Sequence, residues 1–95
     1  MKFSAKVEKV MGEGGWHVVL LPSEITGKLH DESGKNGNVP VIVTIGKSTY
    51  PTTIMSMGDQ RWFFAVKAAV RKAEGIANGD TVSVAIVPDV GRLSL

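Results

Sequence analysis

The sequence predicts a mainly β protein, a small closed β-barrel of six or seven strands with one short α-helix. Three observations lead to this prediction. Strand-like segments recur along the chain, helical periodicity is confined to one segment, and two parts of the chain echo each other. The strands are expected at residues 3–8, 16–21, 39–45, 49–57, 61–66 and 81–87.

The first two strands are recognised by alternation and by apolar content. Residues 3–8 alternate apolar and polar side chains, as a strand with one buried face does. Residues 16–21 form an almost continuous apolar run. A glycine-rich turn at residues 11–15 precedes this run, and Pro22 ends it.

Little regular structure is expected between the second and third strands. Ser23 can cap a short helical turn through Ile25, which Gly27 is expected to end. Residues 30–38 contain no apolar side chain, so they have nothing to anchor in a core. We therefore expect the most mobile internal segment of the chain here.

The next three strands follow one another closely. Residues 39–45 place four branched apolar side chains on one face. Residues 49–57 are rich in threonine and isoleucine, and Pro51 within them indicates a sheet edge or a bulge. A turn at Gly58 separates this segment from residues 61–66.

The period changes to that of a helix over residues 66–74, and we expect the one true helix near residues 67–74. Gly75 is placed to end it, and residues 81–87 return to the period of a strand. At 100° per residue, four apolar side chains share one helix face: Val66, Ala69, Val70 and Ala73.

The chain also contains an internal echo with an offset of about 45 residues. Residues 16–29 and 62–75 both begin with tryptophan, continue as an apolar strand and end as a short helix. Leu21 falls on Val66 in this alignment. Two related strand–helix–strand halves commonly close one barrel around a pseudo-twofold axis.

Alternation along the strands and the helix face assigns the core. A one-residue error in alternation would invert the two faces of a strand. The side chains assigned to the core are Val18, Leu20, Val41, Val43, Val70, Val82, Val84 and Ile86.

Length and composition limit the class of protein. With 95 residues, 43% hydrophobic and 21% charged, we expect one globular domain over residues 1–89 and a tail at 90–95. The absence of cysteine excludes disulfides and thiolate chemistry within this chain and fits a cytoplasmic location. No apolar run approaches the ~20 residues of a membrane span. A net charge of +2 without a basic arm is too small to argue for strong nucleic-acid binding.

Several longer segments carry a family pattern. These are WHVVLLP, VPVIVTIGKSTYPTTIMSMGD and FFAVKAAVRKAEGIANGDTVSVAIVPD, of which VRKAEGI and NGDTVSV are the most specific. Together with the opening FSAKVEK, they resemble the domain-of-unknown-function family numbered 1905 over about residues 2–89. Thr53 and Gln60 depart from the pattern, where a serine and a small turn residue are expected.

The resemblance implies a fold and a source but no activity. It implies a small bacterial or archaeal protein with a closed barrel of the double-split kind. Such barrels are related to the swapped-hairpin barrels of bacterial transition-state regulators and antitoxins. Those regulators close their barrel from two chains and bind DNA. Here one chain supplies both halves, so we expect a monomer or a weak homodimer.

Patterns for catalysis and metal binding are weak. His17 lies in a strand and His30 opens a polar loop, and no carboxylate cluster at ligand spacing accompanies either. The GEGG sequence at residues 12–15 precedes a strand, whereas a phosphate loop precedes a helix. We therefore expect no catalytic residue, no metal ligand and no cofactor.

The strongest candidate site is cationic. No acid lies between Arg61 and Lys72, and Lys67 and Arg71 have the four-residue spacing of one helix flank. This pair could clamp a carboxylate or a phosphate, or Arg71 could form an ion pair with Glu74 on a solvated flank. The residues expected beside the pair are Trp16, Trp62, Tyr50 and Arg61.

Three functions stay open on the sequence alone. The first is a non-catalytic binding module for a small anionic ligand or peptide, without a membrane partner. The second is a DNA-binding regulator related to the swapped-hairpin barrels, and the third is a small enzyme with a pocket. A contiguous positive face would favour nucleic acid, whereas a concave pocket that contains Lys67 or Arg71 would favour a small ligand.

Overall fold

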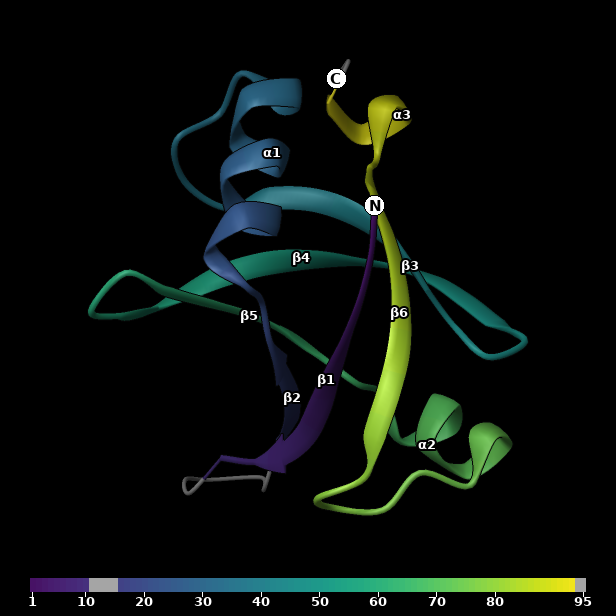
Figure 1. Ribbon diagram of the computed structural model, residues 1–95. Helices are drawn as coiled ribbons and strands as arrows, with labels where there is room; N and C mark the ends of the chain where they lie inside the picture. The colour runs from purple at the N-terminus through teal and green to yellow at the C-terminus, as the bar shows by residue number, and fades with distance from the viewer. Residues whose placement is uncertain (11–15, 94–95) are drawn as a thin grey trace.

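Six strands close into one antiparallel barrel in the computed structural model, which describes residues 1–10 and 16–93 (Figure 1). They are β1 (Lys2–Lys9), β2 (His17–Leu20), β3 (Val39–Ile45), β4 (Ser48–Gly58), β5 (Arg61–Ala65) and β6 (Thr81–Pro88). Around the barrel their order is β1-β2-β5-β4-β3-β6, and every pairing is antiparallel. The predicted closed barrel is confirmed with six strands, while the turn predicted at 11–15 lies outside the described residues.

Strands β1 and β4 each change partner along their length, which gives the barrel its split form. β1 pairs with β6 through residues 2–6 and with β2 through residues 7–9. β4 pairs with β3 through residues 48–54 and with β5 through residues 55–58. Pro51 lies in the half of β4 that pairs with β3, and the register of β4 against β5 is bulged before Gly58. Exchanging β1 with β4, β2 with β5 and β3 with β6 leaves all strand neighbours unchanged, so the topology has a pseudo-twofold axis.

The internal echo extends to individual hydrogen bonds. The Leu21 N–H donates to the Trp62 carbonyl at 2.9 Å, and the Val66 N–H donates to the His17 carbonyl at 2.8 Å. The offset that aligns Leu21 with Val66 also aligns His17 with Trp62. The donor and acceptor of one bond therefore correspond to the donor and acceptor of the other. The two tryptophans that suggested the echo are therefore one residue out of structural register.

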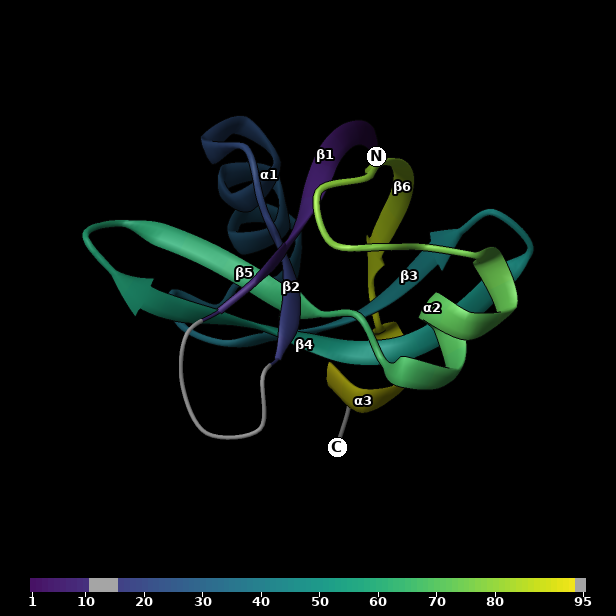
Figure 2. The same ribbon diagram turned by 90° about the horizontal axis from the view of Figure 1, so that it is seen from below.

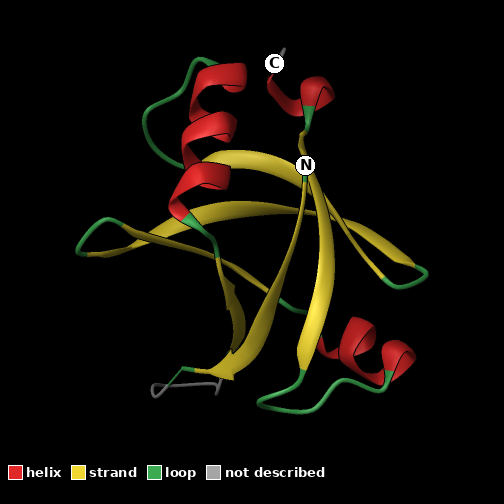
Figure 3. Cartoon of the chain, in the orientation of Figure 1, coloured by secondary structure: helices red, strands yellow, loops and turns green. Residues whose placement is uncertain are grey.

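Three helices accompany the barrel in the described residues: α1 (Ser23–Ser33), α2 (Ala68–Glu74) and α3 (Val90–Leu93). α1 and α2 lie on opposite sides of the barrel in two perpendicular views (Figures 1 and 2). The colouring by secondary structure shows the strands between them (Figure 3). The expectation of one helix is thus wrong, and the longest helix is α1, with 11 residues.

Helix α1 replaces the single turn that was expected after β2 and the first part of the loop that was expected at residues 30–38. Ser23 is its first residue rather than its cap, and the helix passes through Gly27 to end at Gly34, whose φ is 71°. The first four residues of the segment 30–38 are therefore helical.

The reason for this longer helix is the burial of Leu29. Leu29 is fully buried one turn after Ile25, so both side chains extend the core at the end of the barrel. Burying one leucine side chain stabilises by about 1.5–3 kcal/mol, which outweighs the ~1 kcal/mol that Gly27 costs inside a helix.

Helix α2 is shorter than predicted and buries a narrower face. It begins at Ala68, with Lys67 as an extended residue before its first turn, and it ends at Gly75 as predicted. Val70 is its buried residue, whereas Ala69 and Ala73 are exposed. The apolar face expected from the helical period is thus wrong for the two alanines, because α2 contacts the barrel along a single line.

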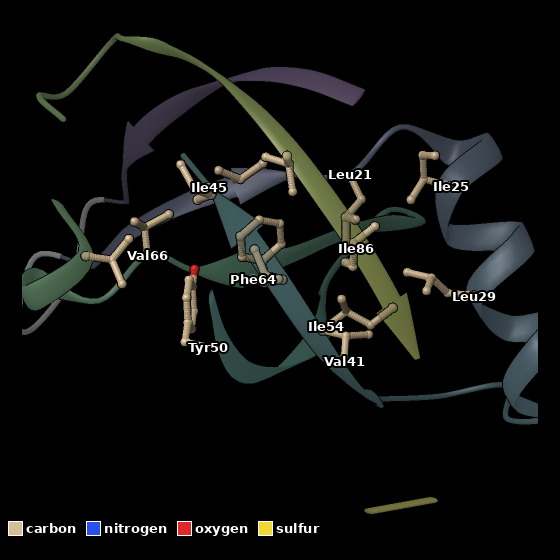
Figure 4. Close-up of a cluster of buried hydrophobic side chains, with 14 of the residues drawn as sticks. Leu21, Ile25, Leu29, Val41, Ile45, Tyr50, Ile54, Phe64, Val66 and Ile86 are labelled. Carbon is tan, nitrogen blue, oxygen red and sulfur yellow. The ribbon is translucent and has the colours of Figure 1, made fainter. Parts of the chain in front are cut away.

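The core runs through the barrel from α1 to α2 (Figure 4). Five of the assigned core residues belong to the central cluster, and Val82 packs against it half-buried. On β2 the assignment is partly right: Val18 is buried as predicted, although it lies outside the central cluster, and Leu20 is only half-buried. Val19 and Leu21, which were not assigned to the core, join the cluster. They were missed because residues 16–21 contain no clear polar alternation to mark the outer face.

The chain after β6 forms α3 and is attached to the barrel by Arg92. Its Nε donates to the Asp89 carboxylate at 2.5 Å, and its terminal nitrogen donates to the carbonyls of Val41 and Thr52 at 2.9 and 2.6 Å. The hydrogen bond from Arg92 holds the pKa of Asp89 below its usual value. The part of the expected tail that is described is therefore fastened to β3 and β4.

The turn between β4 and β5 offers a simple gain in stability. Asp59 and Gln60 have φ values of 52° and 61°, which glycine adopts at little cost and glutamine does not. We expect Gln60→Gly to raise the free energy of unfolding by about 1 kcal/mol in urea denaturation. Gln60→Ala should give no such gain, since alanine is no better suited to this backbone, and an equal gain would contradict the explanation.

Candidate functional site

A pocket of about 200 Å³ lies where β2 begins and β5 leads into α2. It includes three of the six predicted site residues: Trp16, Lys67 and Arg71. The complete lining is Trp16, His17, Ala65, Val66, Lys67, Ala68 and Arg71. The predicted cationic pair is thus found in one concave site, with an aromatic side chain in the same lining.

The two walls of the pocket are joined by the backbone. The Val66 N–H donates to the His17 carbonyl, which ties the end of β5 to the start of β2. The Arg71 N–H donates to the Lys67 carbonyl at 3.0 Å as the first hydrogen bond of α2. Lys67 and Arg71 are therefore positioned by one helical turn, although Lys67 itself lies just outside the helix.

The Arg71 side chain is held by one hydrogen bond to the backbone. Its Nε donates to the Val66 carbonyl at 3.3 Å, and the residue is half-buried. Within the described residues, its two terminal amino groups have no hydrogen-bond acceptor. These groups form the end of the guanidinium that can hold a carboxylate with two parallel hydrogen bonds.

Glu74, the acid expected to neutralise Arg71, is engaged elsewhere. Its carboxylate accepts hydrogen bonds from the Ser48 hydroxyl at 2.7 Å and from the Lys47 N–H at 3.3 Å. It also covers Gly46, where an added Cβ would overlap it. Over residues 1–10 and 16–93 the ion pairs are Asp59 with Arg61 and Asp89 with Arg92, so neither pocket cation has an acidic partner there.

Tyr50 lies near the pocket cations without neutralising them. The Lys67 ammonium is 5.7 Å from the centre of its ring, a cation–π distance. The Tyr50 hydroxyl donates to the Ala65 carbonyl at 3.0 Å, and burial raises the pKa of this phenol far above its usual value. The phenol therefore stays protonated and offers no negative charge to the Lys67 ammonium.

The two remaining predicted site residues lie outside the pocket lining. Trp62 is half-buried and makes a T-shaped contact with His30 of α1, with ring centres 4.8 Å apart. Arg61 is exposed and lies 3.8 Å from the Asp59 carboxylate. His30, which was expected in a mobile loop, also bonds through Nε2 to the Gly37 carbonyl at 3.0 Å.

Two features of the pocket were not predicted. His17 was interpreted as a surface or half-buried strand residue and is half-buried in β2 as expected, but its place in the pocket lining was not predicted. The internal echo could have indicated this position. The offset that aligns Leu21 with Val66 also aligns His17 with Trp62, and the equivalent backbone hydrogen bonds of the two halves connect Leu21 to Trp62 and Val66 to His17. The engagement of Glu74 by the β3–β4 turn has no signal in the local sequence, because its partners are 26 and 27 residues away.

The residues that the structure describes contain neither a metal-binding cluster nor a membrane-spanning helix. Among them no three histidine or acidic side chains are grouped so that they could hold a metal ion. In the part of the chain that is described, no helix has the length and apolar character needed to cross a bilayer.

Comparison with protein families gives a match over most of the chain. The family model described as Domain of unknown function (DUF1905) matches residues 3–86. This range includes the lining of the pocket and ends before α3. No curated protein matches the chain.

Proposed function

Because the chain belongs to the DUF1905 family, whose function is unknown, its role has to be inferred from its site, and we propose a non-catalytic binding protein for a small anionic ligand. The observation that carries this proposal is the pair of pocket cations, Lys67 and Arg71, whose expected acidic partner is bound to another part of the fold. A ligand that carries the missing negative charge would complete the site.

The electrostatics of the pocket favour this interpretation. Charge-assisted hydrogen bonds from arginine and lysine to an oxyanion are about twice as strong as neutral ones. They gain further strength where water is partly excluded, as it is around the half-buried Arg71. An anion that touches both cations would also relieve the repulsion between them.

The size of the pocket favours a small ligand over a macromolecule. A volume of about 200 Å³ is below the ~300–1,000 Å³ of pockets that hold drug-sized molecules. DNA binding would need several neutralised phosphates, and this pocket supplies two cations. Acid–base catalysis commonly uses a pair of such groups, and the described lining contains one histidine, His17, and no carboxylate.

We also propose an assembly and a location. One chain supplies all six strands of the barrel, so a second copy is not needed to close it, which supports a monomer or weak dimer. The absence of cysteine supports a cytoplasmic location, where a chain has no disulfides to lose.

A double variant tests the proposal directly. We expect Lys67→Ala with Arg71→Ala to leave the free energy of unfolding within about 1 kcal/mol of the parent, because neither side chain is in the core. The variant should lose the thermal stabilisation that acetate, benzoate or phosphate gives the parent. A ligand at a hundred times its Kd would stabilise the parent by about 2.7 kcal/mol, which thermal unfolding resolves easily.

The matched control removes the same charge from outside the pocket. Lys35→Ala with Lys72→Ala deletes two exposed lysines that do not line it, and this variant should keep the stabilisation. Stabilisation that survives the loss of Lys67 and Arg71 would place the site elsewhere. Unfolding of that variant would show that the pair is structural, and steeply salt-dependent binding of an oligonucleotide would favour the DNA-binding alternative.

A further inference from the structure

The pocket combines its two cations with an apolar and aromatic lining. Five of the seven lining residues are aromatic or small and apolar: Trp16, His17, Ala65, Val66 and Ala68. Trp16 is 52% exposed, and it is the one aromatic residue among the exposed large hydrophobic residues described. Since Lys67 and Arg71 have no acidic partner among the described residues, an exposed aromatic surface beside them is suited to a ligand with both a charge and a flat apolar body.

From these features we infer that the ligand is a small aromatic monocarboxylate. The inference rests on the proposed function, since it specifies the class of anion that the same pocket binds.

The arrangement of Arg71 favours a carboxylate as the charged group. Its Nε is already bonded to the Val66 carbonyl, which leaves the two terminal amino groups as the available fork. The two oxygens of one carboxylate match this fork, and Lys67 supplies a further point charge to the same group. Phosphate would bring additional oxygens and a larger hydration shell into a pocket whose remaining side chains are mostly apolar.

The lining favours an aromatic body for the ligand. A ring that stacks on the Trp16 indole would bury apolar area on both partners, and aromatic pairs gain more than their buried area alone. The small side chains of Ala65 and Ala68 leave space for a ring without needing to move. The pocket volume of about 200 Å³ limits the ligand to one or two rings.

The inference is tested by isothermal titration calorimetry with three carboxylates that differ in the group attached to the carboxylate. We expect benzoate to bind at least about tenfold more tightly than acetate, because its ring buries apolar area against the lining. Cyclohexanecarboxylate, which is apolar but not flat, should fall between them. Inorganic phosphate should bind more weakly than benzoate.

Variants at Trp16 separate the ring from the charge. We expect Trp16→Leu to weaken benzoate about three- to tenfold and to leave acetate unchanged, while Trp16→Phe keeps most of the benzoate affinity. In a Trp62→Phe background Trp16 is the one indole in the chain, so its fluorescence should change as benzoate is added. Trp62 contacts His30 and lies outside the pocket, so its replacement should not alter binding.

The outcomes distinguish the inference from the proposed function. Equal binding of acetate and benzoate, or benzoate binding that is unaffected in Trp16→Leu, would overturn the aromatic ligand. If Arg71→Gln still abolished carboxylate binding in that case, the proposed anion-binding function would stand. Benzoate binding that survives the double change Arg71→Gln with Lys67→Gln would overturn the aromatic ligand and the anion-binding function together. Benzoate binding that is weakened by Trp16→Leu and lost in the double variant supports both hypotheses.

Discussion

Replacement of Phe64 by alanine is expected to lower the free energy of unfolding by about 3–5 kcal/mol. Phe64 is 0% exposed, and it belongs to the central core cluster. Figure 4 shows its ring between Leu29 on the α1 side and Tyr50 and Val66 on the α2 side. Small domains unfold with about 5–15 kcal/mol in total, so the loss would be a large share of the stability.

Urea denaturation with circular dichroism measures this loss. Phe63→Ala is the matched control, because Phe63 is the preceding residue of β5 and is only half-buried. The same chemical change there should cost clearly less. Equal losses at the two positions would contradict the assignment of Phe64 to the centre of the barrel.

Replacement of Leu29 by alanine is expected to cost about 2–5 kcal/mol. Leu29 is 0% exposed and is the side chain through which the second half of α1 reaches the core. Leu29 is the last buried residue of α1, so after its removal no buried side chain follows Thr26 to stabilise the second half of the helix. The amide protons of this half of α1 should then exchange faster than those of β6.

Lys28→Ala is the control for this second prediction. Lys28 is the preceding residue of the same helix and is exposed, so its replacement should change stability by less than about 0.5 kcal/mol. Faster exchange in residues 30–33 should appear with Leu29→Ala and be absent with Lys28→Ala. A stable, slowly exchanging helix in Leu29→Ala would show that α1 does not depend on this contact.

Much of the barrel was predictable because most of its strands carry their own period. Residues 39–45 alternate between buried and half-buried side chains along their whole length, as the sequence pattern indicates. β2 was harder, since valine at both 18 and 19 gives no local preference for one face. Its inward face is fixed by register, with Val19 opposite Val7 and Phe64, and register is a tertiary property.

The candidate site was predictable in its charges but not in its surroundings. The spacing of Lys67 and Arg71 was sufficient to bring both into one pocket, because one helical turn separates them. Whether the Arg71 charge is neutralised depends on the partner of Glu74. The packing of the fold brings the Glu74 carboxylate to Ser48 in the distant turn instead of to Arg71. Local spacing allows either pairing, so the sequence alone left both open.

The pseudo-twofold axis has a consequence for stoichiometry. The duplicated frame offers two equivalent ends, and the offset that relates them places Lys67 on Pro22 and Arg71 on Thr26. Thr26 is buried and its hydroxyl donates to the Pro22 carbonyl at 3.3 Å, so these positions carry no charge at the α1 end. The two halves that the strand order relates therefore differ in charge at these two positions. If the proposed function holds, one barrel is expected to bind one anion rather than two.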